Sequence, residues 1–121
     1  MAIQDNNLKK ILIGIHNKGA ASLFLDCSKE MGYSADLVST PEDMLTKIKD
    51  NDYCRYLMDG NLGSPCGEDI TPAKKSYNLI KDKKDAKFLA ITGYLNTLEN
   101  LKKENIPCRD RNDLNFFEFL E

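Results

Sequence analysis

The stretch from Gly14 to Gly19 carries residue types that suit the binding of an anion or a nucleotide. An apolar run ends there and a helically spaced segment follows, a strand-to-helix junction at which many α/β proteins hold a phosphate, a metal or a nucleotide. The glycine spacing is that of a P-loop, although Ala20 and Ala21 replace its lysine and its serine or threonine. Backbone N–H groups at the helix start, next to Lys18, are able to hold an anion. The alternative is structural: Gly14 relieves crowding at the strand end and Gly19 starts the helix.

Asp59 is the acidic residue whose position most strongly suggests a site. It directly follows Tyr56-Leu57-Met58, an apolar run typical of a strand covered on both faces. Asn61 follows two residues later. An aspartate here either caps a turn after the strand or belongs to a functional or vestigial site, and the sequence context favours the site.

Short apolar runs alternate with amphipathic segments along the chain. Strands are predicted at 11–15, 56–58 and 88–91, with a weaker strand at 35–38 and a fifth at 106–108. Helical spacing fills the gaps, as where Ala20, Phe24 and Cys27 share one helix face. Thr40 followed by Pro41 predicts the start of the next helix. A Thr-Pro pair at 71–72 repeats this signal, and the last helix is predicted over 113–120.

This alternation predicts an α/β fold with a doubly wound, five-stranded parallel sheet and helices on both faces. Pro107 in the fifth strand has no N–H for the ladder, which is tolerable only at the edge of a sheet. The length of 121 residues and the hydrophobic content of 41% suit one domain spanning 1–121. Residues 1–8 are expected to form a flexible N-terminal segment.

Composition excludes several classes of partner. Lys+Arg 17 against Asp+Glu 19 gives a net charge of -2, so no overall basic field favours nucleic acid or an anionic membrane. No stretch reaches the roughly 18 apolar residues of a membrane span, and we expect a cytoplasmic protein. The four cysteines lie far apart without a Cys-x-x-Cys pair, which argues against a zinc site or a redox motif.

The chain resembles the receiver domains of two-component response regulators over nearly its whole length. The segments that carry the resemblance are KKILIGIHN, MGYSADLVSTPEDMLTKIKDNDY, YLMDGNLGSPCGED and FLAITGY. In the third segment, Asn61 and Gly67 follow Asp59 at two and eight residues. The resemblance implies a flavodoxin-like sheet of strand order 2-1-3-4-5. It also implies that Asp59 stands where receivers carry the phospho-accepting aspartate, and Thr92 where they carry the hydroxyl that contacts the phosphoryl group.

The metal-binding part of the family's pocket is not retained. The acidic pair that receivers carry after the first strand falls on Ile15 and His16, which Asn17 follows. Ile15 has no donor atom and His16 offers a nitrogen, whereas Mg²⁺ prefers hard oxygen ligands. Asp59 and the Asn61 carbonyl remain, so we expect no cofactor and Mg²⁺ binding that is weak or lost.

The family's lysine at the end of the fifth strand is also absent. The region 106–111 reads IPCRDR, and Arg109 or Arg111 is the candidate to replace the lysine. Arginine keeps the charge but not the geometry of an ammonium group. With the acidic pair missing, His16 or Lys18 is a further candidate cation to pair with Asp59.

These residues predict a stand-alone, atypical receiver domain that acts in signal transduction by binding another protein. Mg-dependent phosphorylation is expected to be lost or altered, and no enzyme activity is expected. The expected partner is a histidine kinase, another regulator or a second copy of the chain. Two alternatives stay open: a response regulator that accepts a phosphoryl group at Asp59, and a flavodoxin-like module that binds a small phosphate-bearing ligand at the loop from Gly14 to Gly19.

A partner surface is expected at the last helix. Leu114, Phe117 and Leu120 form one stripe that is predicted to pack inward. Neighbouring residues in a helix are about 100° apart, so Phe116 is then left near the surface. An exposed aromatic there is able to anchor a partner, and the interface is predicted at Phe116 and Leu114. The alternative is that Phe116 is a partly covered rim residue.

Overall fold

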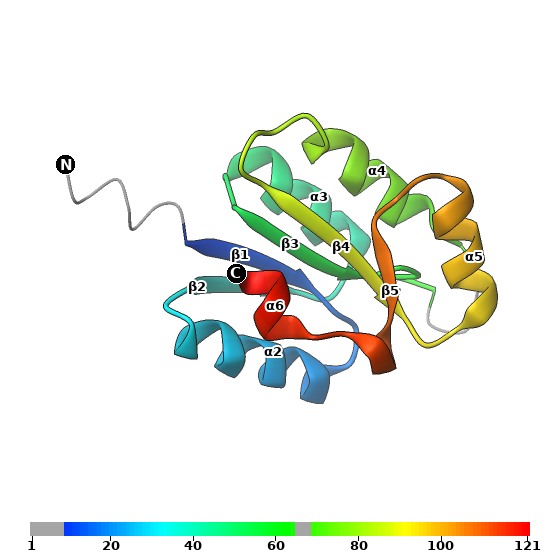
Figure 1. Cartoon of the computed structure of the whole chain (residues 1–121). Coiled ribbons are helices and arrows are strands. Elements are labelled where there is room, and N and C mark those ends of the chain that lie inside the picture. Colours follow the sequence, from blue (N-terminus) through cyan, green and yellow to red (C-terminus); the bar gives the residue numbers. More distant parts are fainter. Residues whose placement is uncertain (1–8, 65–68) are drawn as a thin grey trace.

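The computed structural model describes residues 9–64 and 69–121, and strands and helices alternate along it (Figure 1). The strands are β1 (Lys10–Gly14), β2 (Ser34–Val38), β3 (Arg55–Asp59), β4 (Lys87–Thr92) and β5 (Cys108–Asp110). The helices are α2 (Lys18–Glu30), α3 (Pro41–Asp50), α4 (Thr71–Ile80), α5 (Leu95–Lys103) and α6 (Phe116–Leu120), with a 3-10 turn η1 (Arg111–Asp113) before α6. The segment predicted to be flexible, 1–8, lies outside the described residues, as do Cys66 and Gly67.

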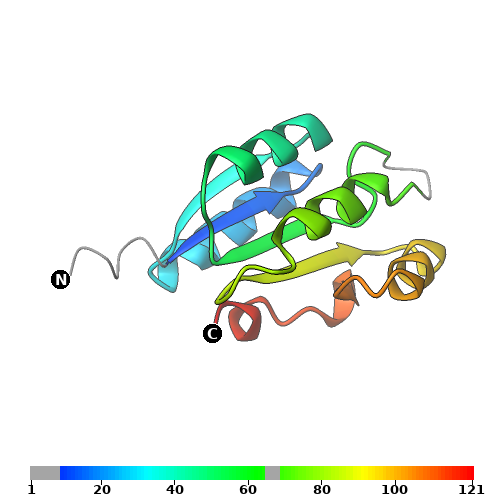
Figure 2. The same ribbon diagram turned by 90° about the horizontal axis from the view of Figure 1, so that it is seen from above.

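The five strands form one parallel sheet in the order β2-β1-β3-β4-β5, which confirms the predicted topology. Figure 2 shows β2, β1, β3 and β4 side by side in that order. β1, β2, β3 and β4 each begin and end within a residue or so of their predicted positions. β5 does not: it covers 108–110 instead of 106–108. The backbone N–H of Ile106 still closes the turn after α5 by donating to Leu101, so the strand begins only after Pro107.

Alternating side chains of the sheet divide the core into two layers. Leu12, Tyr56 and Met58 pack under α3, α4 and α5, while Ile13 and Leu57 pack under α2 and α6. Figure 1 shows α3 and α4 on one side of the sheet and α2 and α6 on the other. The helices therefore cover both faces, as the sequence predicts.

Helix starts are set by capping groups. Thr40 caps α3 by accepting the backbone N–H of Asp43, and Pro41 occupies the first turn, as predicted. The second Thr-Pro pair works differently. Thr71 is already inside α4, and its N–H donates to the side chain of Asp69. The N-cap residue is Ile70, one residue earlier than predicted, and it makes no side-chain capping bond.

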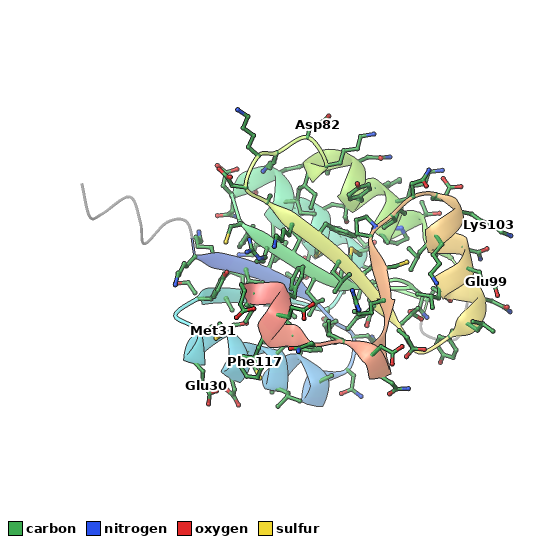
Figure 3. All side chains as sticks on the ribbon, in the orientation of Figure 1. Glu30, Met31, Asp82, Glu99, Lys103 and Phe117 are labelled. Atoms are coloured by element: carbon green, nitrogen blue, oxygen red, sulfur yellow. The ribbon has the colours of Figure 1, made fainter. Side chains whose placement is uncertain are left out.

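The prediction for the last helix is wrong. The turn η1 interrupts the periodicity, so α6 begins only at Phe116, with Asn115 as its cap. Phe116 and Leu120 are then one helical turn apart and both face the core, where the Phe116 ring lies 4.8 Å from the ring of Phe24. Phe116 is 7% exposed and Phe117 is 44% exposed, so Phe116 is a core residue and not the predicted interface aromatic. Figure 3 labels Phe117 beside α6 and α2.

Replacing each phenylalanine by alanine separates these positions. Phe116→Ala is expected to lower the free energy of unfolding by ~3–5 kcal/mol, because it leaves a cavity against Phe24. Phe117→Ala serves as the matched control and is expected to cost much less. Urea denaturation measures both values. Equal losses would show that Phe116 is not the buried member of the pair.

Candidate functional site

The carboxyl ends of the parallel strands meet at one edge of the sheet, where a cavity of about 330 Å³ opens. Such edges are the usual ligand-binding position of open α/β sheets. The cavity is lined by His16, Asn17, Asp59, Asn61, Gly93, Tyr94 and Arg111. Four of the predicted pocket residues are among these seven: His16, Asn17, Asp59 and Asn61.

Asp59 is the last residue of β3, a strand that is buried along its whole length. It lies next to Ile91 of β4 in the parallel ladder. The backbone turns away directly after it, since the Gly60 N–H donates to the Ile91 carbonyl at 2.8 Å. The residue is only 4% exposed, so its carboxylate needs partners within the protein.

Each carboxylate oxygen of Asp59 has a partner. The backbone N–H of His16 donates to Oδ2 at 2.8 Å. The Arg111 guanidinium donates from Nη2 to Oδ1 at 3.2 Å and forms an ion pair there. Charge-assisted bonds of this kind are stronger than neutral ones. The two bonds hold the carboxylate between the start of α2 and the turn that follows β5.

Burial still dominates the electrostatics of this group. Removal from water raises the pKa of the Asp59 carboxyl above the ordinary value of an aspartate. The His16 N–H and the Arg111 guanidinium lower that pKa, but they offset only part of the effect of burial. The folded protein therefore favours the protonated form of Asp59 more than the unfolded chain does.

Arg111, and not Arg109, supplies the cation. Arg109 lies within β5 and is exposed, whereas Arg111 follows the strand and reaches Asp59. Of the two candidate arginines, Arg111 therefore belongs to the pocket and Arg109 does not. Lys18 is exposed at the start of α2 and does not pair with Asp59. The hydrogen bond from His16 to Asp59 comes from its backbone and not from its imidazole. His16 contributes chiefly its backbone N–H, and its ring adds a smaller electrostatic effect that also lowers the pKa of Asp59.

Ile15 does not line the cavity as predicted. It is 2% exposed and packs in the core layer beneath α2 and α6, while its backbone N–H donates to Val38. Strand alternation gives the reason, because Ile11, Ile13 and Ile15 all face the same layer.

Asn61 and Thr92 are both buried, and of the two only Asn61 lines the cavity. The Asn61 side-chain amide donates to the Ser64 carbonyl at 3.0 Å, and the Asn61 backbone carbonyl accepts the Ser64 N–H. Thr92, at 1% exposure, accepts the backbone N–H of Tyr94 through its hydroxyl. Both side chains therefore stabilise the loops that follow their strands. Tyr94 itself, which the sequence prediction missed, is 52% exposed and lines the opening.

The glycines at 14 and 19 fit the structural interpretation. A Cβ on Gly14 would lie 2.6 Å from the Met44 sulfur, so only glycine leaves room for that side chain. Gly19 lies in the first turn of α2. The Asn17 side chain accepts the Ala20 N–H, so one of the free donors at the helix start is already used.

The residues present do not fit a magnesium ion. Asp59 is the only carboxylate among the seven that line the cavity. Within residues 9–64 and 69–121, no three His, Cys, Asp or Glu side chains are grouped so as to hold a metal. Mg²⁺ requires a near-octahedral set of oxygen ligands, and one carboxylate that is already paired with arginine supplies little of it.

Asp59→Asn is expected to raise the stability of the protein at neutral pH. The pKa of Asp59 is raised in the folded state, so the charged carboxylate costs stability, and this loss develops as pH rises from the ordinary aspartate pKa through the raised one. The difference between variant and wild type should vanish in acid, below both values. Thermal unfolding across pH measures it. The matched control is Asp82→Asn at the exposed residue labelled in Figure 3, which should change nothing. A less stable Asp59→Asn at pH 7 would show that the ion pair outweighs burial.

Comparison with known proteins identifies the fold. No protein-family model matches the chain, and no curated protein matches it.

No helix in the described part of the chain has both the length and the hydrophobicity of a membrane span.

Solved structures do match, and several of them are receiver domains. A CheY-like receiver domain from Methanospirillum hungatei JF-1 gives a TM-score of 0.71 at 20% identity, with 93% of this chain and 88% of that chain covered. A CheY-like receiver domain from Methylobacillus flagellatus gives 0.70 at 24% identity, with 94% and 93% covered. The receiver domain of a sensor histidine kinase from Pseudomonas aeruginosa PAO1, solved with a magnesium ion in its active site cleft, gives 0.65 at 17% identity, with 92% and 90% covered. This chain therefore has the fold of a response regulator receiver domain.

Proposed function

We propose that this chain works in signal transduction as a protein-binding receiver module in which Mg-dependent phosphorylation of Asp59 is lost or altered. The observation that carries the proposal is the state of the carboxylate. Both oxygens of Asp59 already have partners, from Arg111 and from the His16 backbone. No second carboxylate lines the described cavity to help hold a metal.

A fixed pocket suits a module that is recognised rather than switched. In a switchable receiver, ligands must favour one of two states by differential binding. Here Arg111 of the chain itself pairs with Asp59. The contact between Arg111 and Asp59 is therefore present without a metal or a phosphoryl group. The proposed partners are proteins, namely a histidine kinase, another regulator or a second copy of the chain, and the module itself catalyses no reaction.

A second candidate function is phosphoryl acceptance at Asp59. It is favoured by the placement of Asp59, Thr92 and Arg111 at the ends of neighbouring strands. In that reaction the P–N bond of a phosphohistidine breaks as a bond forms between phosphorus and an Asp59 oxygen. Arg111 would offset charge on the transferring group. The Asp59 oxygen must first leave its present partner.

A metal titration distinguishes the two candidates. Mg²⁺ is expected to bind with millimolar affinity or worse, because the pocket lacks the oxygen ligands the ion needs. Backbone amide shifts around Asp59 follow the titration, and incubation with acetyl phosphate followed by intact-protein mass spectrometry detects any acyl phosphate. Tight, saturable Mg²⁺ binding together with stoichiometric phosphorylation would establish the second candidate.

A gain-of-ligand variant tests the reason for the weak binding. His16→Asp adds a carboxylate at an exposed position that lines the cavity, and it is expected to tighten Mg²⁺ binding by about tenfold or more. His16→Asn is the matched control, because it removes the imidazole without adding a charge, and it should bind Mg²⁺ as weakly as the wild type does. If both variants behave alike, the missing carboxylate is not what limits metal binding.

A further inference from the structure

A second cavity, of about 550 Å³, lies between α2 and the segment from η1 to α6. Its volume is within the range of ordinary small-molecule sites, which are concave and mostly apolar with few polar groups. From α2 it is lined by Leu23, Phe24 and Cys27. Leu23 is 62% exposed on its rim. We refer to this cavity as the α2–α6 groove.

The opposite wall of the α2–α6 groove is also apolar. It is built from Leu114, Phe116 and Phe117. The buried Phe116 ring packs at a tilt against the ring of Phe24, while Phe117 is nearly half exposed. Because α6 spans only Phe116–Leu120, it covers a small part of the thirteen-residue helix α2. The apolar walls of the groove stay open to an apolar ligand.

Arg111 belongs to both cavities. It lines the pocket of Asp59 and also the α2–α6 groove. Among the described residues that line the groove it is the only charged one, and no aspartate or glutamate is found beside it there. Its side chain is 46% exposed, and its recorded bond uses one of the five guanidinium N–H donors. The groove therefore offers apolar walls with one accessible positive charge.

We propose that the α2–α6 groove binds a small hydrophobic carboxylate, whose apolar part lies between α2 and α6 and whose carboxylate pairs with Arg111 in competition with Asp59. An apolar ligand with a positive charge would meet the guanidinium unfavourably, and a neutral one would leave it unused. A carboxylate matches the planar fork of an arginine. The groove shares Arg111 with the Asp59 pocket, but the proposal does not depend on the function proposed above.

Because Arg111 lines both cavities, ligand binding in the α2–α6 groove is coupled to the ion pair between Arg111 and Asp59. A ligand carboxylate that takes the guanidinium deprives Asp59 of its cation, so Asp59 and the ligand oppose each other. Linkage requires that a change that frees Arg111 from Asp59 strengthens ligand binding. Asp59→Asn is such a change, because it removes the competing negative charge without touching the groove.

The test compares two probes that differ only in charge, phenylbutyrate and phenylbutanol, titrated into the wild-type chain. Backbone amide shifts are followed at Leu23, Cys27 and Leu114 in the groove, and at His16, whose N–H binds Asp59. The acid is expected to bind about tenfold tighter than the alcohol, as a charge-assisted hydrogen bond provides. It should also shift the His16 amide, which the alcohol should not. Equal affinities of the two probes, or no shifts in the groove, would overturn the proposal.

Three variants test whether Arg111 is the charge that binds the carboxylate of the acid. Arg111→Met is expected to remove the advantage of the acid, a loss of about tenfold, and to leave phenylbutanol binding unchanged. Arg109→Met, at the exposed residue of β5 two positions away, is the matched control and should behave as the wild type. Asp59→Asn is expected to bind the acid several-fold tighter. If Arg111→Met keeps the preference for the acid, or if Asp59→Asn leaves the affinity of the acid unchanged, the shared-arginine site is wrong.

Discussion

The Asp59 carboxylate is the group on which the carboxyl edge of this sheet depends, because it is almost fully buried and cannot be left without partners. The chain satisfies it from two distant places. The backbone N–H of His16 comes from the turn after β1, and the Arg111 guanidinium comes from the turn after β5. The Asp59 side chain of the central strand β3 thus links the turn after β1 to the turn after β5. The strand order that places β3 between β1 and β4 makes this possible.

The charges around Asp59 are arranged differently from those of a carboxylate cluster that binds a metal. Where several carboxylates share a pocket, a divalent cation is needed to offset their charge. Here Ile15 lies in the core, and Asp59 is the only carboxylate among the described residues that line the pocket. The Arg111 guanidinium and the His16 backbone N–H lower the pKa of Asp59, but they offset only part of the effect of burial. Asp59 is thus held by groups of the chain itself, a guanidinium and a backbone N–H.

Much of the fold could be predicted from the sequence, because apolar runs and helical spacing report directly which side chains are buried. The strands β1, β3 and β4 and the capped start of α3 at Thr40 follow from such local patterns. The errors concentrate after α5. There the predicted strand is two residues early, and the same displacement separates Arg109 from Arg111.

The prediction of the last helix failed for a related reason. A 3-10 turn has a different period from an α-helix, and η1 therefore resets which phenylalanine faces the core. Residue types identified Asp59 and Asn61 as site residues, but the pairing of Asp59 with Arg111 spans 52 positions. No local pattern encodes such a distance. It depends on the sheet order and on the exact length of β5.

The pKa of Asp59 in the wild type and in Arg111→Met tests the central ion pair most directly. Side-chain carboxyl NMR shifts followed across pH report this pKa for the single residue. Removing the guanidinium takes away an interaction that lowers the pKa, so the pKa of Asp59 should rise further in Arg111→Met and stay unchanged in Arg109→Met. An unchanged pKa in Arg111→Met would contradict the ion pair and, with it, the claim that an arginine of the chain holds Asp59.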